Sequence, residues 1–409
     1  MKWFEQYRVL DLSDEKGSFC GKILGDLGMD VIKIESPQGS PERRREPFYQ
    51  DIPDPEKSLF WFAYNTSKRG ITLNIETPDG QEIFKRLTKK AHFVIESFSP
   101  GYLNGLGLGY SVLSEINPRL IVVSITPFGQ EGPYKDYKDS DLIAMATGGL
   151  MYICGDPDRP PVRCSVEQTY PQGGAQAAAS ALIAHQHRER TGEGQHIDVS
   201  LQECILTTTF FMQHLWQAEG TIMRRNGGRM FRGKTNWRIN YRCKDGYVTY
   251  FFFFGQQGKR TKALVDWMGE EGMAGDLKAV DWEQTSMPDI EPEQAESWSE
   301  VVARFFLTHT KTELYEEATK RNIALVVGSS QADLFSDRQL SARNYWVEVP
   351  HPELQAALTY PGHPFGPGNS FWRISRRAPR LGEHNEEIYK NELGYSTDEL
   401  IILKEANVI

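Results

Sequence analysis

Few residues of this chain stand in a pattern typical of chemistry. His185 and His187 lie two positions apart in an Ala-rich, helix-forming segment. Positions i and i+2 do not share a helix face, so we do not expect this pair to bind one metal ion. The run "ERRRE" at 42–46 has three cations that would either grip an anion or face solvent. The five cysteines form no CxxC pair, which indicates reduced thiols and no metal site.

The common nucleotide and hydrolase motifs are missing from the sequence. No G-x-G-x-x-G follows a strand, and there is neither a Walker loop nor a G-x-S-x-G elbow. The sequence therefore predicts neither a dinucleotide site, nor a nucleoside triphosphate site, nor a serine hydrolase. Any catalytic site must therefore be built from residues outside these widespread motifs.

The composition indicates an ordinary globular protein. The 409 residues suffice for two or three domains, with 39% hydrophobic and 25% charged residues. A net charge of −9 argues against a nucleic-acid partner, which would select a basic surface. No apolar run is long enough to span a membrane, and the first residues do not resemble a signal peptide. We expect a cytoplasmic protein without a nucleic-acid or membrane partner.

Alternating apolar runs predict the elements that must position any site. Short β-rich runs at 7–13, 31–35, 70–75, 92–98 and 120–129 alternate with helical patterns, among them 78–91, 110–118 and 173–190. Such alternation predicts an α/β fold with a doubly wound parallel sheet. Ligands of these sheets bind beyond the carboxyl ends of the strands. Those ends are expected near Ser13, Glu35, Ser97 and Thr126.

The second half of the chain predicts a smaller α+β domain. Residues 196–217 read as a strand followed by one long apolar helix, and 241–254 as a hairpin with a DG turn. We expect four parts, which are a first part of the large domain (1–200), a linker helix (201–224), the small domain (225–330) and a linker that returns to the large domain (331–409).

Several blocks together resemble one protein family. They include "GSFCGKILGDLGMDVIKIESPQGSPER", "VIESFSPGYLNGLGLGY", "HRERTGEGQHIDVSLQE" and "RAPRLGEHNEEI", and they stand in the family's order along nearly the whole chain. They are similar to the family III CoA-transferases, the group of formyl-CoA transferase, carnitine CoA-transferase and 2-methylacyl-CoA racemase. The resemblance implies a large α/β domain built from both ends of the chain, a small domain, and an interlocked dimer. It also implies CoA thioesters as substrates, with no tightly bound cofactor.

The family mechanism requires an Asp that this chain lacks. The Asp attacks the donor thioester, and a carboxylate suits the task because its acyl anhydride remains reactive. It lies four residues before a glycine that matches Gly174, which places Tyr170 at its position; no Asp occurs between Val162 and Gly194. A phenol with a pKa near 10 is ionised in only about one molecule in a thousand at neutral pH. The carboxylate of Glu167 is the one nearby substitute, and otherwise Tyr170 packs in a silent site.

The implied CoA site has also lost cations. Three positions that are basic in the formyl-CoA transferase branch hold Ser36, Glu76 and Gly105. Three other positions match the family, namely Leu73, Phe98 and Lys138. Charge-assisted contacts to phosphate contribute roughly 1.5–3 kcal/mol each, so losing three weakens CoA binding by about 5 kcal/mol.

These features predict a non-catalytic subunit whose partner is a homologous chain that carries the Asp. They are most similar to the Asp-lacking subunit of enzymes of the succinyl-CoA:(R)-benzylsuccinate CoA-transferase type, which act in anaerobic toluene degradation. Three alternatives remain open. The first is an active homodimeric CoA-transferase that uses Glu167 or another nucleophile. The second is a racemase-like acyl-CoA enzyme with an acid/base pair, and the third is a binding protein outside any enzyme complex.

Overall fold

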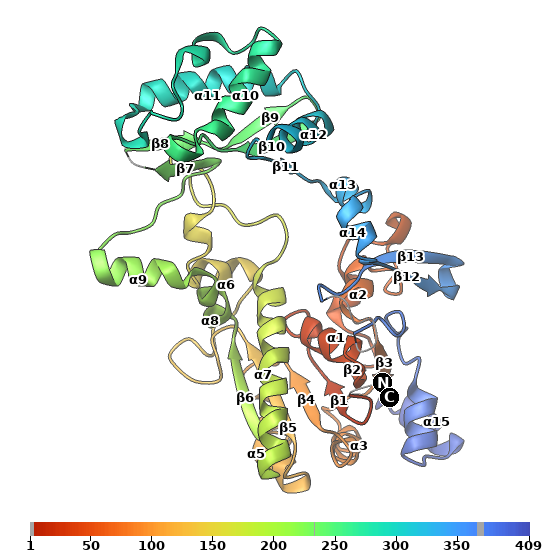
Figure 1. Ribbon diagram of the computed structural model, residues 1–409. Coiled ribbons are helices and arrows are strands. Elements are labelled where there is room, and N and C mark those ends of the chain that lie inside the picture. The colour runs from red at the N-terminus through yellow and green to blue at the C-terminus, as the bar shows by residue number, and fades with distance from the viewer. Residues whose placement is uncertain (1–3, 233, 366–371) are drawn as a thin grey trace. The chain divides into compact units, whose positions relative to one another are not determined.

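The structure is a computed structural model that describes residues 4–232, 234–365 and 372–409 (Figure 1). These residues form two compact units. The larger unit comprises Met1–Met151, Arg163–Thr221 and Ser341–Ile409, and the smaller comprises Tyr152–Val162 and Ile222–Leu340. In the part of the chain that the structure describes, no helix is both long enough and apolar enough to cross a membrane.

A six-stranded parallel sheet forms the centre of the larger unit, with the strand order β3-β2-β1-β4-β5-β6 (Figure 1). Its strands are β1 (Arg8–Asp11), β2 (Asp30–Glu35), β3 (Lys68–Thr72), β4 (Phe93–Glu96), β5 (Ile121–Thr126) and β6 (Gln195–Ser200). Every residue of β3, β4 and β5 is buried, as expected for strands that are covered on both faces. The predicted doubly wound parallel sheet is confirmed.

Helices α1 (Ser18–Asp26) and α7 (Thr169–Thr191) cover one face of this sheet, with α7 lying along β5 and β6 (Figure 1). The two helices approach each other closely because α7 presents small residues. A Cβ atom on Gly174 would lie 2.9 Å from the Cβ of Phe19 and 3.0 Å from the backbone nitrogen of Cys20. A larger residue at 174 would therefore push α1 away from α7.

The opposite face holds α3 (Pro78–Thr88), α5 (Tyr110–Ile116) and the end of the chain. A π-helix at Glu386–Glu392 and helix α15 (Thr397–Glu405) belong to the same layer. Tyr389 is fully buried there, and its hydroxyl donates to the carbonyl of Thr72 at 2.6 Å. The C-terminal part thus returns to the sheet that the N-terminal part builds.

The remaining elements of the larger unit are α2 (Leu59–Tyr64), α4 (Tyr102–Gly105), α6 (Asp141–Thr147), α8 (Leu201–Leu206), α9 (Phe210–Glu219) and the antiparallel pair β12 (Trp346–His351) and β13 (Ala356–Pro361). The long apolar helix predicted after the sixth strand is wrong, because Thr207–Thr209 separates α8 from α9. Each of these threonine hydroxyls donates to a carbonyl three residues earlier. Such local bonds compete with a regular helix.

The smaller unit packs three helices around a sheet with the order β11-β10-β9, beside the antiparallel pair β7 and β8. Its strands are β7 (Arg229–Arg232), β8 (Thr235–Arg238), β9 (Asn240–Cys243), β10 (Gly246–Tyr250) and β11 (Leu325–Gly328). Its longer helices are α10 (Lys259–Glu270), α11 (Pro292–Phe306) and α12 (Lys311–Arg321), and the short α13 (Gln331–Phe335) and α14 (Arg338–Ala342) follow. The predicted hairpin is present, but Lys244 and Asp245 form its turn, because Gly246 already pairs with Cys243.

Buried charges join the first three strands of the sheet. Asp11, Lys33, Glu42 and Lys68 are each at most 1% exposed. Asp11 contacts the Nζ of Lys68 at 2.8 Å and the Nζ of Lys33 at 3.5 Å, and Lys33 lies 3.8 Å from Glu42. Burial alone would raise the pKa of Asp11, but the two ammonium groups hold it below its usual value. Asp11 is therefore the anion on which both lysines depend.

We expect Asp11→Asn to destabilise the protein by about 3–5 kcal/mol, because it leaves two buried ammonium groups short of a counter-charge. The measurement is the midpoint of thermal or urea unfolding, with Asp266→Asn as the matched control. Asp266 pairs with Lys262 at 2.7 Å on an exposed helix surface, so its loss should shift the midpoint much less. Equal shifts for the two variants would contradict the central role of Asp11.

Candidate functional site

A pocket of about 350 Å³ opens at the carboxyl ends of the parallel strands. Residues that follow four strands contribute to its lining, including Ser13, Ser36, Leu73 and Phe98. The strand order changes direction between β1 and β4, and this is the place where sheets of this kind bind ligands. The position predicted from the strand ends is therefore occupied by a pocket.

The structure brings together four of the residues that the sequence assigned to the CoA site. Leu73 and Phe98 line this pocket, and so do Ser36 and Glu76, which stand where cations were expected. Gly105 ends the short helix α4 and is not among the lining residues. Lys138 is exposed in the loop before α6 and does not line the pocket either. The CoA-binding role of Leu73, Phe98 and Lys138 stays a prediction.

One wall of the pocket is aromatic. The rings of Phe98 and Tyr102 stack with their centroids 4.7 Å apart and an angle of 30° between the planes. The Tyr102 hydroxyl donates to Oε1 of Glu76 at 2.8 Å. Partial burial, together with this carboxylate, raises the pKa of Tyr102 to about 12. The hydroxyl therefore stays a donor and holds Glu76 at the pocket mouth.

The other charges in the pocket wall are paired within the protein. Glu35 accepts two hydrogen bonds from the guanidinium of Arg43, at 2.6 and 2.8 Å. Asp14 pairs with Lys16 and accepts from the hydroxyl of Ser97. Lys33 is held by Asp11 and Glu42, as described above. The described lining residues thus offer no unpaired cation to a phosphate group.

Tyr170, which the sequence analysis places at the position of the family nucleophile, is the second residue of α7 and is 7% exposed. Burial raises the pKa of its phenol well above the usual value, and the carboxylates of Asp139, Glu15 and Glu167 raise it further. The phenol is therefore neutral at physiological pH. At the start of this helix, the backbone N–H groups of Gln168 and Thr169 donate to Oδ1 of Asp141 at 2.9 and 2.8 Å.

Glu167, the alternative nucleophile, is engaged in an ion pair. Its Oε1 accepts a hydrogen bond from Nη2 of Arg45 at 2.6 Å, and the Arg45 guanidinium lies 4.0 Å from the centroid of the Phe60 ring. Attack on a thioester would require this pair to open. Sequence reasoning considered Arg45 only as part of the "ERRRE" run and missed its pairing with Glu167, which lies 122 positions away along the chain.

The "ERRRE" run fits neither of its two predicted roles as a whole. Arg43 is 1% exposed and pairs with Glu35, and Arg45 pairs with Glu167. The exposed Arg44 donates to the carbonyl of Gln38 at 3.0 Å. Two of the three arginines therefore neutralise carboxylates of this chain rather than a bound anion.

Glu96 is a further buried acid at the end of β4 and is 5% exposed. Its Oε2 accepts from the backbone N–H of Phe98 at 2.8 Å, so it fixes the residue that forms the aromatic wall. Burial raises its pKa to about 7, and the charges of Asp14 and Asp198 act in the same direction. Nothing in the sequence indicates this shift, because it depends on burial and on charges that lie far from Glu96 along the chain.

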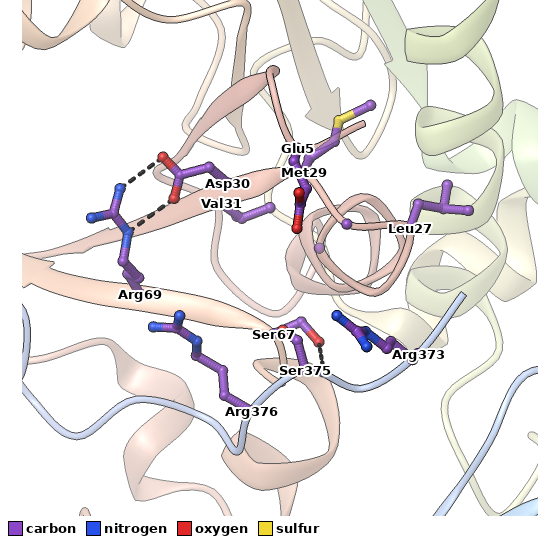
Figure 2. A pocket seen from close by; sticks show the side chains of 12 residues that line it. Glu5, Leu27, Met29, Asp30, Val31, Ser67, Arg69, Arg373, Ser375 and Arg376 are labelled. Carbon is purple, nitrogen blue, oxygen red and sulfur yellow. Dashed lines mark hydrogen bonds and ion pairs between the residues drawn. The ribbon is translucent and has the colours of Figure 1, made fainter. Parts of the chain in front are cut away.

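A second cavity of about 320 Å³ lies at the amino ends of β2 and β3 (Figure 2). Arg69, Arg373 and Arg376 line it, and Figure 2 shows Arg69 paired with Asp30. It contains none of the residues that the sequence assigned to a site. Within the described ranges, no three His, Cys, Asp or Glu side chains are grouped so that they could hold a metal ion.

Comparisons with known proteins identify the family. The chain belongs to CoA-transferase family III, whose model matches residues 4–385. It is 36% identical over 402 residues to the succinyl-CoA:(R)-benzylsuccinate CoA-transferase subunit BbsE of Thauera aromatica. This match covers 97% of this chain and 96% of the relative. It is 31% identical over 422 residues to formyl-CoA:oxalate CoA-transferase of Streptomyces avermitilis, covering 100% of both.

A solved structure agrees with this assignment. The crystal structure of a CAIB/BAIF family protein from Brucella suis superposes with a TM-score of 0.82 at 28% identity, and the match covers 94% of this chain and 98% of that chain. The predicted family resemblance is thereby confirmed. CoA-transferases of this family act on CoA thioesters and hold no tightly bound cofactor.

We expect Glu96→Gln to change how stability depends on pH. With a pKa near 7 in the folded chain and 4.5 as its ordinary value, Glu96 keeps a proton on folding that the unfolded chain releases. Stability of the native protein therefore falls as pH rises through this window and levels off above it. The variant should match the native protein at the acid end and exceed it above neutral pH by up to about 3 kcal/mol.

Urea unfolding across the pH range measures this difference. Glu115→Gln, on the exposed side of α5, is the control and should parallel the native protein. A Glu96→Gln variant that also parallels the native protein would contradict the raised pKa.

Proposed function

We propose that this chain is the non-catalytic subunit of a heteromeric family III CoA-transferase. The observation that carries this proposal is the buried, neutral phenol of Tyr170 at the place where the family chemistry needs a carboxylate. The neighbouring acids disfavour any further negative charge there. An acyl-enzyme anhydride therefore has no suitable residue on which to form.

The pocket at the strand ends supports the same proposal. CoA carries several phosphate charges, and binding them normally requires unpaired cations. In this pocket the lining cation Lys33 already pairs with Asp11 and Glu42. Glu76 adds a negative charge at the pocket mouth. A chain that leaves CoA binding to its partner does not need cations here.

Helix α9 supports the existence of a partner chain. None of its ten residues is buried, although several are large and apolar. Phe210, Phe211 and Trp216 are 59%, 66% and 57% exposed. Exposed apolar surface of this kind is typical of protein–protein contacts. We propose that a homologous subunit that carries the Asp covers this helix.

The substrates of the complex are proposed from the similarity to the Thauera aromatica subunit. On that basis the complex moves CoA from succinyl-CoA to an aromatic dicarboxylate of the (R)-benzylsuccinate type, in the breakdown of aromatic compounds. The alternative of an active homodimer requires Glu167 to leave Arg45, at 2.6 Å. A racemase-like reaction requires a second acid or base where the neutral Tyr170 stands.

We expect the purified chain alone to transfer no CoA from succinyl-CoA to (R)-benzylsuccinate, and the complex with the Asp-bearing sister chain to do so. Chromatography of the CoA esters measures the transfer. Replacing the sister's nucleophilic Asp by Asn should abolish turnover of the complex, while Glu167→Gln in this chain should leave it unchanged. Turnover by this chain alone, or a hydroxamate on Glu167 after incubation with succinyl-CoA and hydroxylamine, would refute the proposal.

Restoring the acid alone should not restore catalysis. In Tyr170→Asp the new carboxyl group lies among Asp139, Glu15 and Glu167, which disfavour its ionised form. The missing phosphate contacts also weaken CoA binding by about 5 kcal/mol. Turnover should therefore stay at least about 10³-fold below that of the sister chain. Adding Ser36→Arg and Glu76→Lys should raise it, because both residues line the pocket. A single variant as active as the sister would show that only the nucleophile is missing.

A further inference from the structure

The cavity of about 320 Å³ at the amino ends of β2 and β3 is separate from the pocket at the carboxyl ends of the strands (Figure 2). The first residues of β2, Asp30 and Val31, line this amino-end cavity. The last residue of β2, Glu35, lines the pocket instead. The two hollows therefore lie at opposite ends of the same strand, and the chemistry proposed for the complex gives no role to the amino-end cavity.

Part of the lining of the amino-end cavity is apolar and buried. Leu27, Met29 and Val31 line it and are 7%, 3% and 1% exposed. The volume falls within the range of small-molecule sites, which starts at roughly 300 Å³. The cavity is therefore suited to a small ligand that has a hydrocarbon part.

The charged part of the lining has an excess of cations. Its charged residues are Arg69, Arg373, Arg376, Glu5 and Asp30. Asp30 is already paired with Arg69 and Arg8, each at 2.7 Å. Among the described residues, no carboxylate pairs with Arg373 or Arg376. Two guanidinium groups in the wall of one cavity repel each other unless an anion neutralises them.

The surroundings of Arg376 show that one of its N–H groups lacks an acceptor. Its Nη1 lies 3.2 Å from Nε2 of His384, while Nδ1 of His384 accepts from the backbone N–H of Gly70 at 3.1 Å. Burial lowers the pKa of His384, so the ring is neutral at physiological pH. A neutral imidazole has a single acceptor nitrogen, which here is Nδ1. Nε2 therefore carries a proton and faces Arg376 as a second donor, an arrangement that an anionic acceptor would satisfy.

Backbone hydrogen bonds hold the segment of both arginines at the cavity. The N–H of Arg373 donates to the carbonyl of Asp26 at 2.8 Å, and the N–H of Ser375 donates to Oγ of Ser67 at 3.0 Å. The N–H of Ser67 in turn donates to the carbonyl of Arg376 at 3.0 Å. Ser67 has a φ of 62°, a left-handed conformation that residues other than glycine rarely adopt. The backbone is thus fixed, while the side chains of Arg373 and Arg376 are exposed and can be reached from solvent.

We propose that the amino-end cavity binds a short-chain dicarboxylate, with Arg373 and Arg376 each taking one carboxylate group. A guanidinium forms two parallel hydrogen bonds with a carboxylate, and the hydrocarbon part of the ligand covers the apolar lining. The inference does not depend on the proposed function, because neither arginine lines the pocket or acts on Tyr170.

Isothermal titration of the full chain at constant ionic strength tests the site with three probes. Succinate has two carboxylates joined by a hydrocarbon chain, acetate has one carboxylate, and inorganic phosphate has charge without apolar surface. Succinate should bind saturably, with acetate and phosphate at least about tenfold weaker. Succinate should also raise the midpoint of thermal unfolding, because it binds only the folded chain.

Substitutions of the two arginines locate the site. Arg373→Gln and Arg376→Gln should each weaken succinate about tenfold, because each removes a charge-assisted contact. Arg376→Lys should lose less, since lysine keeps the charge but not the planar fork. Arg380→Gln, an exposed arginine of the same part of the chain and outside the cavity lining, is the matched control and should change nothing.

The inference is overturned if the native chain shows no saturable binding of succinate, or if acetate or phosphate binds as tightly as succinate. It is also overturned if both glutamine variants bind succinate like the native chain. Each result comes from this chain alone and requires no turnover. Failure here would leave the proposed transferase role untouched, and failure of that role would not alter the binding of succinate.

Discussion

The buried contact between Asp11 and Lys68 is the constraint on which the larger unit depends. It joins the end of β1 to the start of β3, and Lys33 of β2 completes the set. Groups this deep are stable only together, because each isolated charge would be strongly penalised by burial. The loop between β1 and α1 starts from Asp11, whose carboxylate also accepts from the backbone and hydroxyl of Ser13.

That loop connects the two parts of the candidate site. Asp14 lines the pocket, and Asp14 and Glu15 both act on the phenol of Tyr170. Asp14 therefore belongs to both regions, as a lining residue of the pocket and as one of the carboxylates that disfavour ionisation of Tyr170.

The sequence predicted the elements whose signal is local. Strands β4 and β5 were found because they are continuous apolar runs, and the ends of the runs at 7–13 and 31–35 predicted the sheet edge near Ser13 and Glu35. Other features depend on residues far apart in the chain and could not be found this way. The ion pair of Arg45 with Glu167 spans 122 positions, and the pKa of Glu96 reflects burial by neighbours from several elements. The break at Thr207–Thr209 was missed because apolar periodicity outweighed the side-chain bonds of threonine.

Helix α9 has a consequence for the cell that makes this chain. A helix with no fully buried residue gains little stability from packing within its own polypeptide. Copies of this chain without a partner on Phe210, Phe211 and Trp216 would expose an apolar surface, which chaperones and proteases recognise. If the proposed partner subunit covers this helix, balanced synthesis of the two chains, as from one messenger RNA, sets how much of this protein persists.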